Sequence, residues 1–182
     1  CAGRGRPTSG RRTSLAHRAW LRFALLRRKP RVDLVMSPGY RYALPGGLLD
    51  AERSTRISSF LRRAGLTLRR RSHRPHPASF AELRAAHDDD YLERLQHPGA
   101  LTSVVGFAIS DRAEQELLAV QREMTGGTLL ATRLARAWGG IAVNLGGGFH
   151  HAHRARGAGF CILNDVAVAI RAQRARGFDR RI

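Results

Sequence analysis

The segment spanning residues 139–165 constrains the fold more than any other part of the chain. It begins with an apolar run at 141–145, which is long enough for a buried strand and too short for a helix. Glycines at 146–148 then permit a sharp turn, and His150 and His151 follow before a helix-like run closes the segment. This order predicts that the two imidazoles lie at the carboxyl end of a strand in an α/β sheet, where such folds hold their active sites.

The adjacent histidines suit proton transfer. Different partners can keep one imidazole as a neutral base and its neighbour as a charged acid. Alternatively, His150 and His151 are solvated loop residues or chance metal ligands. The glycines before the pair and the Gly159-Phe160-Cys161 run after it favour a functional site.

The run GGGFHHAHRARGAGFCILND at 146–165 resembles the active-site segment of the zinc-dependent histone deacetylases and their bacterial relatives, the acetoin-utilisation and acetylpolyamine amidohydrolase proteins. MTGGTLLATRLA at 124–135 looks most similar to the class IV branch. The resemblance extends over residues 32–182. It implies an α/β fold with a three-layer, mainly parallel sheet of the arginase–deacetylase type, of which this chain is the N-terminal part.

The resemblance also implies roles for single residues. His150 and His151 match the family's catalytic pair, which handles protons while an acyl-amide is hydrolysed. Substrate contacts fall on Phe149, Gly159 and Phe160, since the glycine carbonyl can accept the amide hydrogen bond and the ring can flank an acyl-lysine chain.

Two further positions follow from the same resemblance. Arg56 matches an arginine that lines an internal channel behind the site, although Ser54 stands where the family has proline; a surface arginine is the alternative. Cys161 matches a cysteine close to the substrate tunnel, and we expect a structural role for it.

Zinc is the implied cofactor, because the family uses it to polarise the carbonyl and activate water. The ligands, an Asp-x-His and a later Asp, are expected after Ile182, so no metal ligand is assigned within this chain. His150, His151 and His153 on one loop do not make a convincing three-ligand site. We therefore expect the chain alone to be inactive and unstable, with an open parallel-sheet edge and uncovered helix faces.

The expected activity of the parent protein is removal of an acyl group, most simply acetyl, from an acetylated lysine of a protein or from an acetylated polyamine. Two alternatives remain open. One is a ureohydrolase-like metalloenzyme of the same fold, and the other is a catalytically inactive basic binding module that uses its arginines on an anionic partner.

Charge and cysteine usage limit the partners and the compartment. The net charge is +18, and Lys29 is the only lysine. Because the arginines are spread along the chain, we interpret them as solvated surface residues and predict no specific nucleic-acid partner. No apolar run approaches the roughly 20 residues that span a bilayer, so no membrane contact is expected. Only Cys1 and Cys161 are present, which favours reduced thiols and a cytoplasmic protein.

The remaining pattern predicts the elements. We expect a basic, disordered leader at 1–31 and a deacetylase-like domain at 32–182. Strands are predicted at 32–36 and 66–68, and a capping box joins Ser79 to Glu82 before a short helix. The predicted long helices are 51–64, 111–137 and 162–176.

Three details of these helices can be checked against a structure. The first should bury one face, formed by Ile57, Phe60, Leu61 and Ala64. The second contains Gly126 and Gly127, each costing about 1 kcal/mol relative to alanine, which indicates close packing against another element. The third should turn inward Ile162, Val166, Ala169 and Ile170.

Overall fold

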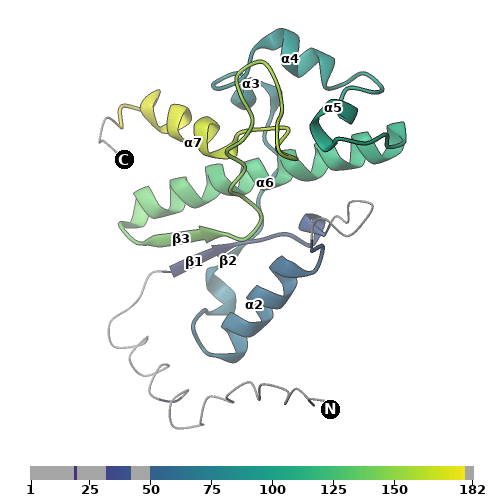
Figure 1. The fold of residues 1–182 in the computed structure, drawn as a ribbon. Helices are drawn as coiled ribbons and strands as arrows, with labels where there is room; N and C mark the ends of the chain where they lie inside the picture. Colours follow the sequence, from purple (N-terminus) through teal and green to yellow (C-terminus); the bar gives the residue numbers. More distant parts are fainter. Residues whose placement is uncertain (1–18, 20–31, 42–49, 179–182) are drawn as a thin grey trace, which may run out of the picture.

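A parallel sheet lies between helices in the computed structural model, which describes residue 19, residues 32–41 and residues 50–178. The strand order is β2-β1-β3, and β1 pairs in parallel with both neighbours. Figure 1 shows α6 and α7 on one side of the sheet and α2 on the other. The predicted three-layer α/β arrangement is therefore confirmed.

The elements have the following bounds. The strands are β1 Val32–Val35, β2 Ser72–His73 and β3 Ile141–Asn144. The 3-10 helices are η1 Pro38–Tyr40 and η3 Arg69–Arg71. The α-helices are α2 Arg53–Arg63, α3 Phe80–Leu83, α4 Asp89–Arg94, α5 Thr102–Val105, α6 Asp111–Trp138 and α7 Asp165–Arg174. Apart from Ala19, the predicted leader at 1–31 lies outside the described residues.

Helix α6 packs against both β1 and β3, as well as η1 and α7. Its paired glycines make this close approach possible. A Cβ at Gly126 would overlap the carbonyl oxygen of His76, and a Cβ at Gly127 would lie 2.6 Å from Asn144 Oδ1 and overlap the Tyr40 hydroxyl. The prediction that the two glycines mark close packing is confirmed.

The hydrophobic core fills the space between α6, α7 and the short helices α3 to α5. Its least exposed side chains include Leu83, Leu101, Leu117, Leu129, Ile162, Leu163 and Val168. A buried hydrogen bond from Tyr91 Oη to the Ile162 carbonyl, at 2.8 Å, ties α4 to the segment before α7. This core supports the loop that carries the histidines. In the part of the chain that the structure describes, no helix has the length and apolar character required to cross a membrane.

The buried face of α2 differs from the prediction. Ser54 and Ser58 are buried, whereas Ile57 is 38% and Phe60 59% exposed. The Ser54 hydroxyl donates to the carbonyl of Leu145 at 3.3 Å. Ala64, at the end of the helix, is buried as predicted, and Leu61 is half-buried. The small polar side chains of Ser54 and Ser58 form the rest of the inner face of α2.

The predicted strand at 66–68 is wrong. The chain instead forms η3 and then β2 at Ser72–His73. Asp33, which is buried in β1, explains the register, because its carboxylate contacts His73 Nε2 at 2.7 Å and Arg71 Nη1 at 3.3 Å. This polar cluster holds β2 beside β1, and the sequence pattern gave no sign of it.

The exposure of β3 and α7 also corrects the prediction. Strand β3 lies at the edge of the described sheet, so Ile141 is 64% and Val143 40% exposed rather than buried. Helix α7 begins at Asp165, later than expected, with the Asn164 side chain accepting from Ala167 N. Ile162 and Ala169 are buried as predicted, whereas Val166 is 40% exposed and Val168 is buried.

Replacing Gly126 by alanine tests the close packing of α6. An exposed helical position would gain about 1 kcal/mol from this change. Here the new methyl group would overlap the His76 carbonyl, and we expect a net loss of about 2 kcal/mol. Urea unfolding of the protein would measure the loss, and a Gly126→Ala variant as stable as the parent would contradict the packing.

His87 links α4 to the start of α7 and is 2% exposed. Its Nε2 accepts the backbone N–H of Asn164 at 3.0 Å, which requires a neutral ring with its proton on Nδ1. Burial lowers the pKa of the His87 imidazole from the usual value of 6.5. The folded state therefore binds fewer protons than the unfolded state just below this pH.

This difference predicts a pH dependence. As pH falls through 6.5, histidine in the unfolded chain takes up a proton before folded His87 does, so the free energy of unfolding decreases until the lowered pKa is passed. Denaturation midpoints at a series of pH values would measure this slope. His87→Gln keeps an acceptor and removes the titration, so its curve should be flatter than that of the parent chain. Equal slopes would contradict the assignment.

Candidate functional site

A glycine turn carries the chain away from the carboxyl end of β3. Leu145 N still donates to the Val35 carbonyl at 3.0 Å, and the glycines follow directly. A Cβ at Gly146 would lie 2.5 Å from the Tyr40 ring, and Gly148 has a φ of 104°. Glycine is thus required for both space and backbone conformation. This turn lies at the carboxyl end of β3, the end of the strand at which the sequence predicts the site.

His150 and His151 lie side by side after this turn. Their ring centroids are 4.1 Å apart with an interplanar angle of 41°, and both residues are exposed. His150 Nδ1 lies 3.1 Å from the Gly148 carbonyl, which can only accept, so Nδ1 carries the proton. In the neutral ring, Nε2 then has the free lone pair. The arrangement fits the proton transfer predicted from the sequence.

Gly159 and Phe160 form a tight turn beside the histidines. Ala158 N donates to the Cys161 carbonyl at 3.0 Å, and Cys161 N donates back at 2.8 Å. The φ angles of 53° and 63° at the two central residues match a type I′ turn. A Cβ at Gly159 would lie 3.2 Å from the His151 ring, so the glycine backbone packs against that imidazole.

Gln121 on α6 stabilises this turn and was missed by the sequence analysis. It is 1% exposed, and its Nε2 donates to the Phe160 carbonyl at 2.7 Å. Its Oε1 accepts from the backbone N–H groups of Ile162 and Leu163 at 2.9 and 3.3 Å. These bonds offset the unfavourable positive φ of Phe160. The available signal was a glutamine on the apolar face of a long amphipathic helix.

Phe149 lines a cavity of about 60 Å³ behind the glycine turn, together with Tyr40, Asp50, Arg53, Ser54, Leu117, Val120, Gln121, Met124 and Gly146. Arg56 does not line it; its side chain is 65% exposed and pairs with Asp50. Arg53, three residues earlier on α2, is the arginine at this cavity. The channel role of Arg56 stays a prediction.

The described residues contain no group of three or more His, Cys, Asp or Glu side chains that could hold a metal ion. His150, His151 and His153 therefore do not fit a zinc site in this structure, and no chemical step is assigned to a metal here. Zinc ligands beyond Ile182 stay a prediction.

Cys161 lies behind the Gly159–Phe160 turn as a buried free thiol. Burial raises the pKa of this thiol, and the charge of Asp165 adds to the effect. Its Sγ donates to the Gly159 carbonyl at 3.5 Å. A protonated thiol that contacts the turn is consistent with the predicted structural role.

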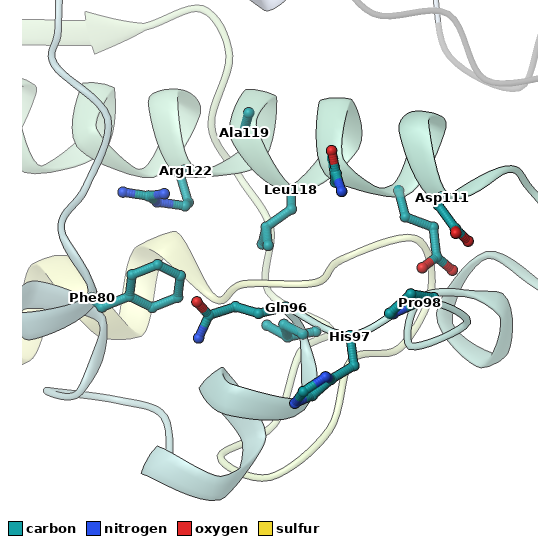
Figure 2. Close-up of a pocket in the computed structure, with 11 residues that line it drawn as sticks. Phe80, Gln96, His97, Pro98, Asp111, Leu118, Ala119 and Arg122 are labelled. Atoms are coloured by element: carbon teal, nitrogen blue, oxygen red, sulfur yellow. The ribbon is translucent and has the colours of Figure 1, made fainter.

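A second cavity, of about 220 Å³, lies between α3, α6 and the chain after α4 (Figure 2). The Glu114 carboxylate there accepts from Gly99 N at 2.8 Å and from Leu101 N at 3.0 Å. Arg122 Nε donates to the Ala78 carbonyl, and its guanidinium lies over the Phe80 ring. These charged groups bind backbone groups and so stabilise the fold. None of the residues predicted for the site lines this cavity.

Comparison with known proteins agrees with the geometry. The family description "Histone deacetylase domain" matches residues 48–182. Histone deacetylase 2 of Arabidopsis thaliana is 30% identical over 151 residues, covering 77% of this chain and 38% of that protein. Acetoin utilization protein AcuC of Bacillus subtilis is 39% identical over 104 residues, covering 53% of this chain and 27% of that protein.

Solved structures give the same result. The crystal structure of an HDAC homolog from Aquifex aeolicus superposes with a TM-score of 0.66 at 25% identity, over 82% of this chain and 42% of that one. The structure of an HDAC homolog complexed with SAHA gives a TM-score of 0.67 at 25% identity, over the same shares of the two chains.

The chain spans less than half the length of these relatives. The predicted arginase–deacetylase type of fold is confirmed by the structural match. The resemblance to histone deacetylases and acetoin-utilisation proteins, read from residues 146–165, is also confirmed. The chain belongs to the histone deacetylase domain family.

Proposed function

We propose that the protein containing this chain is a zinc-dependent deacetylase that hydrolyses the acyl-amide of acetyl-lysine or of an acetylated polyamine. The observation that carries the proposal is the juxtaposition of His150, His151 and Gly159 at the carboxyl end of β3. The two rings are 4.1 Å apart, and the glycine backbone packs against His151. Membership of the histone deacetylase domain family supports the choice of reaction.

His150 and His151 act in this proposal as the proton-transfer pair. The Gly148 carbonyl orients the His150 ring and leaves its Nε2 available toward solvent, where a substrate can approach. A neutral imidazole can take a proton from an attacking water and return it to the leaving amine. Zinc, when bound, would supply polarisation of the acyl carbonyl.

Gly159 and Phe160 hold the acyl-lysine chain in this proposal. Among the described residues, the Gly159 carbonyl accepts a long contact from Cys161 Sγ, at 3.5 Å, and a carbonyl has two lone pairs. It can therefore also accept a substrate amide N–H. Phe149 and Phe160 are half-buried, so each leaves part of its ring available to an acyl-lysine chain. A buried, protonated Cys161 also suits the reducing cytoplasm, where we place the protein.

The proton-transfer roles of His150 and His151 can be tested by removing either imidazole. The test uses a longer protein that includes residues after Ile182. We expect His150→Ala and His151→Ala each to lower kcat by about 10²- to 10⁴-fold, the usual contribution of a positioned acid or base. Bound zinc, measured by metal analysis, should be unchanged. His153→Ala, in the same exposed loop, is the matched control and should keep its activity. Loss of zinc without loss of proton transfer would contradict the roles.

The chain of 182 residues should be inactive by itself. Incubation with zinc and an acetyl-lysine peptide should give no acetate, because the described residues provide no three-ligand site. The longer protein, assayed in parallel, should release acetate and be inhibited by SAHA. Zinc-dependent release by the chain alone would overturn this expectation. If the longer protein is inactive as well, the binding-module alternative is preferred.

A further inference from the structure

We infer that Asn164 and Asp165, at the start of α7, form a clamp that positions the two imidazoles of His150 and His151. Asn164 and Asp165 are positioning residues rather than catalytic ones, since they contact the backbone of the histidine loop. The inference rests on the proposed function for its activity readout, and it also has a structural readout of its own.

Asp165 holds the N–H groups on the amino-terminal side of the pair. It is 0% exposed. Its Oδ1 accepts from Phe149 N at 2.7 Å, and its Oδ2 accepts from Gly148 N at 3.0 Å and from the Thr128 hydroxyl. Hydrogen bonds between a charged carboxylate and backbone N–H groups are stronger than neutral ones. The backbone immediately before His150 is therefore fixed.

Asn164 holds two carbonyl groups, one within the histidine pair and one directly after it. Its Nδ2 donates to the His150 carbonyl at 3.3 Å and to the Ala152 carbonyl at 2.9 Å. Its Oδ1 caps α7 by accepting from Ala167 N at 2.9 Å. One amide side chain thus joins the helix start to the backbone at and after the pair, with the acceptor used for the helix and the donor for the loop.

The clamp is attached to rigid elements. Thr128 lies on α6, and its Oγ1 accepts from Asn144 Nδ2 at 2.9 Å. Asn144 ends β3, and its Oδ1 accepts from the Tyr40 hydroxyl at 2.9 Å. Gly147 crosses this network, where a Cβ would lie 2.8 Å from Asn144 Nδ2 and overlap Asp165. The network therefore connects η1, β3, α6 and α7 to the histidine loop.

The rings themselves have few side-chain restraints. In the part of the chain that the structure describes, their one ring hydrogen bond is His150 Nδ1 to the Gly148 carbonyl, and both residues are exposed. Asn164 and Asp165 hold the backbone from which both rings project, so a change at either residue shifts the base of the pair. A displacement of about 1 Å at a reacting group can lower the rate by about 10²-fold.

Two isosteric changes separate the halves of the clamp. Asp165→Asn replaces one acceptor by a donor that faces backbone N–H groups. Asn164→Asp keeps the cap on Ala167 but replaces the donor by an oxygen that faces two carbonyls. In the zinc-loaded longer protein, we expect each variant to lower kcat by about 10- to 100-fold, with little change in KM. Zinc content should be unchanged.

Asp33→Asn is the matched control for general destabilisation. It also removes a buried carboxylate, one that binds His73 and Arg71 and makes no contact with the histidine loop. We expect a comparable fall in Tm with kcat and the pH profile of kcat/KM unchanged, whereas Asp165→Asn should change that profile. A kcat for Asp165→Asn no lower than that of Asp33→Asn would overturn the clamp. The proposed function would be tested separately by the kcat of His151→Ala, which does not depend on the clamp.

Amide hydrogen exchange gives the readout that does not need activity. In the parent protein, the N–H groups of Gly148 and Phe149 should be protected, and Asp165→Asn should speed their exchange while Asp33→Asn does not. Fast exchange of both amides in the parent would overturn the clamp even if the protein is an active deacetylase. Protected amides that Asp165→Asn releases, in an inactive protein, would support the clamp and reject the proposed function instead.

Discussion

The geometry of the site depends on how closely α6 approaches the strands. Because Gly126 and Gly127 have no side chains, the helix packs against the His76 backbone and the side chains of Tyr40 and Asn144. This places Thr128, one residue further along α6, within reach of Asp165. A wider separation would break the hydrogen bonds between β3, α6 and α7. The carboxylate would then be buried with fewer partners, which is costly in an apolar interior.

The same packing explains why the buried polar residues of this core each have defined hydrogen-bond partners. Gln121, Asn144 and Asp165 each contact a backbone segment that turns away from regular structure. Each satisfies N–H groups that a helix or strand would otherwise pair. Gln121 holds the turn at Phe160, and Asp165 holds the turn before His150. The two loops of the site are therefore shaped by buried side chains from the helices behind them.

Local patterns in the sequence predicted much of this fold, and long-range polar contacts explain what they missed. Strand β1, helix α6, the capping box at Ser79 and the His150–His151 loop follow from apolar runs, glycines and cap residues, which act over a few positions. The register of β2 depends on Asp33, some forty positions earlier. The inner face of α2 depends on a bond from Ser54 to Leu145, and the role of Gln121 on a turn that periodicity cannot reveal.

The edge of the described sheet bears on what completes the site. Strand β3 presents Ile141 and Val143 to solvent and pairs on one side with β1. Parallel sheets normally have both faces covered, and natural proteins protect exposed strand edges. His150 and His151 follow this same strand, so a strand that pairs in parallel with β3 would have its carboxyl end beside them. Groups that complete a catalytic centre would thus reach the histidines from the carboxyl end of such a neighbouring strand, the position at which open α/β sheets bind their ligands.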